Sequence, residues 1–128
     1  MAALSKGTQI LLVDDQSSMR QLVKRQLESA GYSGIQEASS GVEALVKLDA
    51  SQFDLVILDW TMPQMTGLEV LKQIRQKVAF KELKVMMLTA EGLKENVISA
   101  IQAGANGYVV KPFTLQTLIQ KVAATLPT

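Results

Sequence analysis

Cysteine and histidine are both absent from this 128-residue chain. Without cysteine there can be no disulfide, no thiol nucleophile and no zinc–thiolate site. Without histidine the chain lacks the commonest general base and metal ligand, and it cannot pass on a phosphoryl group from a histidine of its own. Any chemistry in this protein must therefore use carboxylates, lysines, hydroxyl groups and a bound cation.

An excess of one charge and long hydrophobic runs are also missing. The 13 Lys and Arg residues face 12 Asp and Glu residues, so bulk charge favours neither nucleic acid nor an anionic membrane as a partner. No apolar stretch approaches the roughly 20 residues that span a bilayer, and no secretory signal precedes the first apolar run. The length fits one hydrophobic core. We therefore expect one cytoplasmic domain over residues 1–128, with no further output domain.

Four short, β-rich apolar runs each end in a polar residue. They are Ile10–Val13 before Asp14 and Asp15, Leu55–Leu58 before Asp59, Val85–Leu88 before Thr89, and Tyr108–Val110 before Lys111. Such runs are typical of buried parallel strands. Ligands of open α/β sheets bind just outside the carboxyl ends of the strands. If the runs are neighbouring strands, three carboxylates, one ammonium group and one hydroxyl group meet at one edge of the sheet.

Helical patterns alternate with these runs and with a weaker strand over residues 35–38. Capping boxes over 18–21, 40–43 and 66–69 predict the starts of three helices. A fourth helix is predicted over Lys94–Ala103 and a fifth from Thr114. Five strands, each followed by a helix, predict a (βα)5 doubly wound parallel sheet with helices on both faces.

Two of these helices are predicted to carry apolar faces. The third helix places four such residues on one face, Leu68, Leu71, Ile74 and Val78. The last helix carries a full apolar stripe of Leu115, Leu118, Ile119, Val122, Ala123 and Leu126.

The three carboxylates raise the question of a metal ion. A lone Asp after a strand is usually a turn former or a helix N-cap. Asp14 and Asp15 together with Asp59, however, would place like charges side by side, and these cannot all stay ionised without compensation. Mg²⁺ would resolve the repulsion, because it keeps several waters and needs few carboxylates. On spacing alone, a metal site and ordinary turn residues are equal alternatives.

Lys111 and Thr89 also have two interpretations each. Lys111 is either a surface lysine or an inward-facing ammonium group fixed by the strand before it and Pro112 after it. Thr89 either caps the next segment or binds, with Lys111 and Mg²⁺, the oxygens of a phosphoryl group. Carboxylates accept phosphoryl groups in covalent catalysis, and a metal with a lysine stabilises the charge of such groups.

Together these motifs resemble the receiver domains of two-component response regulators. The matching residues are Asp14-Asp15, Asp59, Met62-Pro63, Met65, Gly67, Thr89-Ala90 and Lys111-Pro112-Phe113. Residues 89–114 and Asp59-Trp60 are similar to the stand-alone chemotaxis regulators of that family. The resemblance implies a flavodoxin-like three-layer sandwich. It also implies a monomeric switch that is not an enzyme but promotes its own phosphorylation and dephosphorylation.

The resemblance further implies roles for the acidic residues. Asp59 would accept a phosphoryl group from a histidine kinase. Asp14, Asp15 and Asp59 would hold Mg²⁺, with the backbone carbonyl of Thr61 as a further ligand. The family's chemotaxis members usually carry Asn where this chain has Thr61, and often Phe where it has Gln16. Both positions border the expected path of hydrolytic water, so the dephosphorylation rate and the phosphatase partner stay open.

The switch residues are implied in the same way. Thr89 and Lys111 would bind the phosphoryl oxygens, and Tyr108 would turn inward on activation. The Lys111–Pro112 peptide bond would be cis, as only about one X–Pro bond in twenty is. The fourth helix, fifth strand and fifth helix would bind a flagellar motor switch protein or another target, in chemotaxis or flagellar control.

Three other functions are considered. A phosphate sink or phosphorelay receiver would use the same chemistry without a motor target. A flavin or nucleotide carrier fits poorly, because the first strand–helix loop, Asp14–Ser18, has two acids and no glycine and would repel a phosphate. A phosphatase with an aspartate nucleophile would want a second acid at the position of Thr61.

Overall fold

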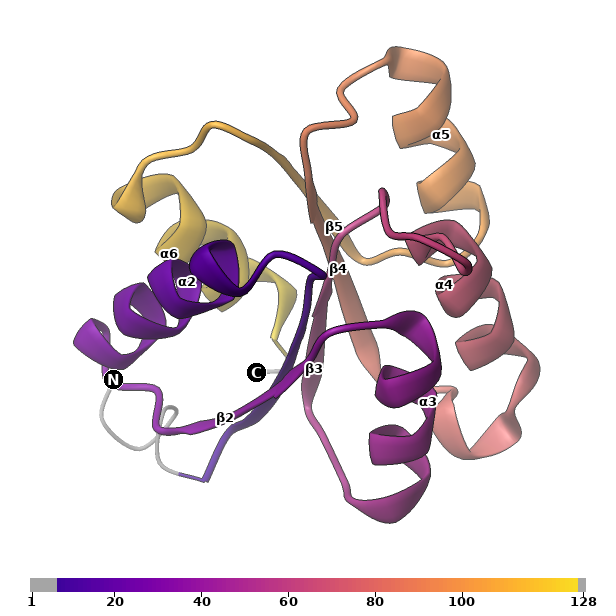
Figure 1. The fold of residues 1–128 in the computed structure, drawn as a ribbon, viewed down its shortest axis with the longest axis horizontal. Coiled ribbons are helices and arrows are strands. Elements are labelled where there is room, and N and C mark those ends of the chain that lie inside the picture. Colours follow the sequence, from indigo (N-terminus) through magenta and orange to yellow (C-terminus); the bar gives the residue numbers. More distant parts are fainter. Residues whose placement is uncertain (1–6, 127–128) are drawn as a thin grey trace.

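The computed structural model describes residues 7–126 as a parallel sheet between two layers of helices (Figure 1). The strands are β1 (Gln9–Val13), β2 (Gly34–Ala38), β3 (Leu55–Leu58), β4 (Lys84–Thr89) and β5 (Gly107–Val110). The helices are α2 (Ser17–Ser29), α3 (Gly41–Ala50), α4 (Gly67–Gln76), α5 (Lys94–Gln102) and α6 (Leu115–Thr125), with a 3-10 turn, η1 (Val78–Phe80). The predicted (βα)5 order is confirmed. No helix within residues 7–126 is long and apolar enough to cross a membrane.

The strand order places β1 and β3 at the centre of the site-bearing edge. The order is β2-β1-β3-β4-β5, and every neighbouring pair is parallel. Val13 is the register partner of Leu58, so the residues that follow them, Asp14 and Asp59, lie next to each other. The chain changes direction across the sheet between β1 and β3, which is where open α/β sheets bind their ligands.

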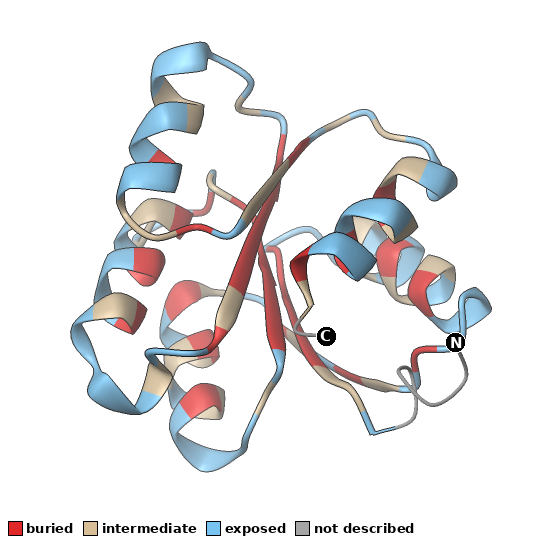
Figure 2. Ribbon diagram, turned by 180° about the vertical axis from the view of Figure 1, so that it is seen from behind, coloured by how far each residue is buried: buried red, intermediate tan, exposed pale blue. Residues whose placement is uncertain are grey.

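The sheet separates two hydrophobic cores, because successive strand residues point to opposite faces. Ile10, Leu12, Leu55, Ile57, Met86 and Leu88 pack with α2 and α6 on one face. Leu11, Val13, Val56, Leu58, Val85 and Met87 pack with α3 and α4 on the other. Figure 2 shows the buried sheet between partly exposed helices. Burial on both faces explains why these strands read as continuous apolar runs.

The starts of α4, α5 and α6 agree with the sequence, whereas that of α2 does not. Thr66 forms the full predicted capping box with Glu69, and Thr114 accepts a hydrogen bond from the Thr117 N–H at 3.0 Å. The capping box over residues 18–21 is wrong, because α2 already begins at Ser17, after an N-cap at Gln16. The Gln16 N–H donates instead to Asp14 Oδ1 at 2.9 Å. Asp14, the acid that follows β1, therefore fixes the start of α2.

The start of α3 agrees only in part. The Ser40 hydroxyl accepts from the Glu43 N–H at 3.1 Å, as a capping box requires. The Glu43 carboxylate, however, accepts from the Ser39 N–H and hydroxyl rather than from the Ser40 N–H. These hydrogen bonds lower the pKa of Glu43, with Lys47 adding a smaller effect of the same sign.

Two predicted apolar faces are narrower than expected. Val78 is 88% exposed, because α4 ends at Gln76 and the chain turns into η1 before reaching it. In α6, Leu118 and Val122 are buried, whereas Leu115 is 45% exposed and Ala123 is exposed. Only one side of α6 contacts the sheet and α2, so the outer part of the predicted stripe faces solvent.

Candidate functional site

Three carboxylates meet at the carboxyl ends of β1 and β3, as predicted. Asp14, Asp15 and Asp59 each offer a carboxylate oxygen, and these oxygens lie within 4.8 Å of one another. Asp14 and Asp59 are buried, and Asp15 is exposed. Carboxylates at this spacing repel one another strongly unless positive charge lies between them.

Lys111 supplies one such positive charge. Its ammonium nitrogen lies 3.0 Å from Asp14 Oδ2 and 3.4 Å from Asp59 Oδ2, and its side chain is only 13% exposed. Lys111 thus has the inward-facing placement rather than that of a surface lysine. The Lys111 N–H donates to the Thr89 carbonyl at 2.8 Å, so β4 fixes the backbone there. The Lys111–Pro112 bond is cis, as the resemblance implied.

The two buried carboxylates are held to different degrees. Asp14 accepts hydrogen bonds at 2.9 Å from the Gln16 N–H and at 3.0 Å from Lys111. The corresponding contacts of Asp59 are longer, at 3.3 Å from the Thr61 N–H and 3.4 Å from Lys111. Because its oxygens are engaged less tightly, Asp59 is the buried carboxylate better able to form a new bond.

Thr89 lies fully buried at the end of β4 and does not cap a helix. Its hydroxyl accepts from the Glu91 N–H at 3.2 Å, whereas the N-cap of α5 is Leu93. This hydrogen bond stabilises the turn that follows the strand. Of the two interpretations from sequence, the helix cap is therefore wrong, and the hydroxyl lies at the same sheet edge as the carboxylates.

Tyr108 connects β5 to the loop after Thr89. Its hydroxyl donates to the backbone carbonyl of Glu91, and its half-buried ring packs against the core on the α3–α4 face. Burial raises the pKa of Tyr108, and the negative charges of Glu91 and Asp59 raise it further. The Glu91 carboxylate in turn accepts from the Asn96 side chain at 2.7 Å, which ties the loop to α5.

Gly67 allows the loop after β3 to fold back on Asp59. Its N–H donates to the Trp60 carbonyl at 2.7 Å. A Cβ at this position would lie 2.0 Å from the Asp59 carbonyl oxygen and 2.8 Å from the Trp60 Cα, which is too close for any side chain. Glycine is therefore required here for a close backbone approach that positions Asp59.

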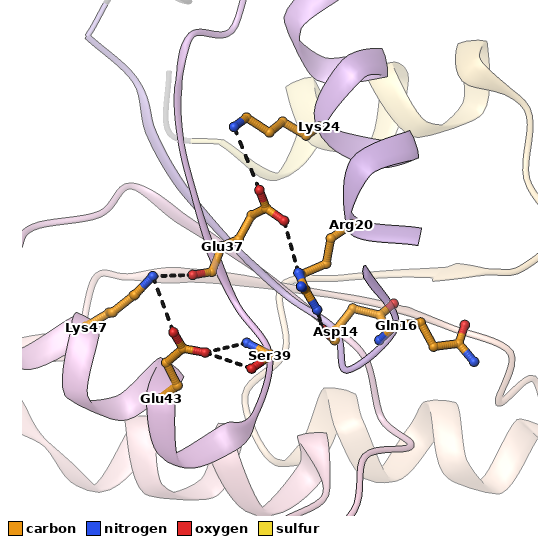
Figure 3. A network of polar contacts seen from close by, with 8 residues as sticks. All are labelled: Asp14, Gln16, Arg20, Lys24, Glu37, Ser39, Glu43 and Lys47. Atoms are coloured by element: carbon orange, nitrogen blue, oxygen red, sulfur yellow. Dashed lines mark hydrogen bonds and ion pairs between the residues drawn. The ribbon is translucent and has the colours of Figure 1, made fainter. Parts of the chain in front are cut away.

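Sequence reasoning missed a second set of residues beside the site, shown in Figure 3. Arg20 on α2 donates to the Asp14 carbonyl and lies 3.0 Å from the Glu37 carboxylate on β2. Arg20 and Glu37 are 17 positions apart. No local pattern signals such a pair, because it depends on how α2 packs beside the edge strand.

A cavity of about 810 Å³ lies at the opposite edge of the sheet. Its lining includes Asp49, Asp54, Phe80 and Lys84, near the amino ends of β3 and β4. The acidic cluster does not contribute to it. We place the chemistry at the cluster, because the buried carboxylates and the lysine converge there rather than in the cavity.

The charges of the cluster fit a hard divalent cation. Three carboxylates are paired with one ammonium group, so an excess of negative charge remains. Oxygen ligands and incomplete neutralisation are the conditions that Mg²⁺ meets in proteins. The exposed Asp15 gives such an ion access from solvent, whereas Asp14 and Asp59 form the buried side.

The sheet order, the carboxylate cluster and the inward lysine define a class of signalling domain. The chain belongs to the response regulator receiver domain family, whose model matches residues 10–123. Within that family it is a receiver domain of the CheY type. It is 49% identical over 121 residues to the chemotaxis protein CheY-3 of Vibrio cholerae, covering 94% of this chain and 93% of the relative.

Solved structures show the same relationship. The chemotaxis protein CheY4 of Vibrio cholerae superposes with a TM-score of 0.87 at 39% identity, covering 93% of this chain and 98% of that one. The response regulator TrrA of Thermotoga maritima superposes with a TM-score of 0.83 at 42% identity, covering 93% and 99%. That structure is a complex with Mg²⁺ and BeF. The flavodoxin-like three-layer fold is therefore confirmed.

Proposed function

We propose that this protein is a phosphorylation-activated switch in which Asp59 accepts a phosphoryl group from a histidine kinase. The observation that carries the proposal is the placement of Asp59. It is a buried but loosely held carboxylate beside two others and the Lys111 ammonium group, at the carboxyl end of β3. Membership of the receiver family supports the same role.

The transfer requires one bond to form and one to break. A carboxylate oxygen of Asp59 attacks the phosphorus, and the bond from phosphorus to the donor's imidazole nitrogen breaks. The electron pair of that bond returns to the nitrogen, and the donor leaves as neutral histidine when its other ring nitrogen carries a proton. The product is an acyl phosphate on Asp59. Lys111 and the Thr89 hydroxyl would hold the phosphoryl oxygens, because both lie at the same sheet edge. Fixed positive charge and hydrogen-bond donors lower the barrier to such transfers.

Mg²⁺ would be held by Asp14, Asp15 and Asp59, together with the Thr61 backbone carbonyl. When bound, the ion supplies positive charge against the phosphoryl oxygens. Support comes from the charge excess of the cluster and from TrrA, whose structure holds Mg²⁺ with BeF. Gln16 and Thr61 are exposed beside the cluster, where they would influence the access of the water that removes the phosphoryl group.

The target would bind a face made of α5, β5 and α6. Exposed apolar side chains lie on or next to these elements, namely Leu93, Ile98, Ile101, Val110 and Leu115. Tyr108 and the Glu91 loop connect this face to Thr89 at the site. We propose a cytoplasmic monomer that acts in chemotaxis, with a flagellar motor switch protein as the target, a CheA-like kinase as donor and a phosphatase as a further partner.

Phosphoryl uptake tests the proposal directly. The protein is incubated with acetyl phosphate and Mg²⁺, and its intact mass is recorded. One added phosphoryl group is expected, and it should be lost on standing as the acyl phosphate hydrolyses. A mass that stays unchanged, with Mg²⁺ present and the protein folded, would contradict the proposal.

Tyr108 is expected to shift its population on activation. A ligand can move a two-state element only by binding one state more tightly. The structure holds the ring in the inward position bonded to Glu91. In solution we expect the ring to be outward or mixed in the free protein, and to be held inward once Asp59 carries beryllofluoride with Mg²⁺. The measurement is fluorine NMR of protein labelled with fluorotyrosine, in which the buried Tyr32 serves as the internal control.

The Tyr108 resonance should sharpen and shift in wild type, and should not respond in Asp59→Asn. The Tyr32 resonance should stay constant in both. An identical Tyr108 resonance before and after beryllofluoride would show that this switch is absent. That result would favour the alternative function, a phosphate sink or phosphorelay receiver.

A further inference from the structure

The Arg20 side chain makes two contacts that meet beside the acidic cluster. Its Nη1 donates to the backbone carbonyl of Asp14, and its Nε lies 3.0 Å from Glu37 Oε1. The side chain is 15% exposed, so water competes little for these contacts. The planar guanidinium places the two nitrogens at a fixed relative direction, which a lysine cannot reproduce.

The Asp14 carbonyl belongs to the peptide unit that joins Asp14 to Asp15. Because a peptide unit is planar, fixing its carbonyl oxygen also fixes the directions of the Cα atoms on both sides. These two Cα atoms carry two of the three carboxylates in the cluster. The Asp14 N–H is bonded to the Ala38 carbonyl of β2 at 3.2 Å, but Asp15 is exposed and lies two residues beyond Val13, where β1 ends. Arg20 therefore holds the part of this segment that the sheet does not.

Glu37 anchors Arg20 to the edge strand. It is the register partner of Leu12 in β1, and its carboxylate also lies 3.7 Å from Lys24. Its backbone carbonyl accepts from Lys47 on α3 (Figure 3). The guanidinium is thus held between a strand carboxylate and the Asp14 carbonyl, rather than lying free on the surface of α2.

We propose that Arg20 is a positioning residue, which sets the relative orientation of the Asp14 and Asp15 carboxylates by holding the peptide unit between them. The inference rests on the proposed Mg²⁺ site. Loss of a positioning residue and loss of a nearby charge change the Mg²⁺ affinity in opposite directions. A nearby cation repels Mg²⁺, so loss of the Arg20 charge alone would tighten binding. Loss of positioning would weaken it, and partners of metal ligands typically change metal affinity by roughly 10- to 100-fold.

The experiment is a Mg²⁺ titration followed by the fluorescence of Trp60, the residue after Asp59. Arg20→Ala is expected to raise the Mg²⁺ midpoint by roughly tenfold. Arg20→Lys keeps the charge but not the planar guanidinium, and should also raise the midpoint severalfold. Glu37→Gln removes the charge of the anchor but keeps an acceptor oxygen, and should have a smaller effect of the same sign. Arg25→Ala is the matched control, an exposed arginine on the same helix, and should leave the midpoint within about twofold.

The outcomes separate the two proposals. If wild-type protein shows no Mg²⁺ response by fluorescence or calorimetry, the proposed metal site is wrong, and so is the proposed role of Arg20. A normal wild-type response with an unchanged or lower midpoint in Arg20→Ala would overturn the role of Arg20 alone. If circular dichroism shows that Arg20→Ala is unfolded, Arg20→Lys decides, and an unchanged midpoint in that variant would overturn the proposal.

Discussion

The Asp59→Asn variant is expected to take up no phosphoryl group from acetyl phosphate and Mg²⁺, whereas wild type takes up one. The amide that replaces the carboxylate is not a nucleophile for phosphorus, and the remaining acids are poor substitutes. Both oxygens of Asp14 are engaged, by the Gln16 N–H at 2.9 Å and by Lys111 at 3.0 Å. Asp15 is exposed, and the ion pairs that Lys111 forms within the described residues are with Asp14 and Asp59. Intact mass after a fixed incubation gives the result.

Asp54→Asn provides the matched control for this loss. Asp54 lies at the other end of β3, where its carboxylate accepts from the Gln9 N–H at 2.8 Å. The same chemical change at the opposite edge of the sheet should leave uptake equal to wild type. If Asp59→Asn gains the same mass as wild type under the same conditions, another residue is the acceptor.

Replacement of Asp15 by Ala is expected to weaken Mg²⁺ binding by more than about tenfold, which corresponds to about 1.4 kcal/mol. Asp15 is the exposed member of the cluster and, as a ligand, would contribute its negative charge to a hard cation. Neighbouring Asp14 cannot compensate, because it is itself one of the three carboxylates proposed to hold the ion. The midpoint of the Trp60 fluorescence titration measures the change.

The control for the Mg²⁺ prediction is Asp49→Ala. Asp49 is an exposed carboxylate at the end of α3, where it pairs with Lys77 at 3.1 Å. Its loss changes the net charge as Asp15→Ala does, but not the cluster. Equal midpoints in wild type and Asp15→Ala would show that Asp15 is not a ligand. An equally weakened Mg²⁺ binding in Asp49→Ala would show that the effect comes from net charge alone.

The strands and their order along the chain could be predicted because each is buried on both faces. Val56 and Ile57 have no exposed surface, although they point to opposite cores, so the apolar run is continuous and its end is marked by Asp59. The same reasoning predicted that the carboxylates and Lys111 lie close together. Parallel strands end at one edge, and the polar residue after each strand must lie there.

The helix ends were less predictable, because tertiary contacts decide them. At α2 the N-cap moved to Gln16, since the Asp14 carboxylate satisfies its N–H. Val78 was expected on the apolar face of α4, but it lies outside that helix because η1 begins there. Sequence periodicity describes an isolated helix and says nothing about where the next turn must form.

The positioning contacts of the site could not be predicted at all. The Arg20 and Glu37 contact depends on the angle between α2 and β2, and the requirement for Gly67 depends on a loop that folds back to Asp59. The Tyr108 hydroxyl, on β5, donates to the Glu91 carbonyl in the loop after β4. Such contacts follow from the packed fold and have no local sequence pattern.

The most direct test of the account is to locate the phosphoryl group on the chain. The protein is phosphorylated with acetyl phosphate and Mg²⁺ and treated with borohydride, which reduces an aspartyl phosphate to homoserine. Peptide mass spectrometry then identifies the changed residue. We expect homoserine at residue 59 and unmodified Asp at residues 14 and 15. Homoserine at either of those positions, or none anywhere in a protein that gained phosphate, would contradict the account.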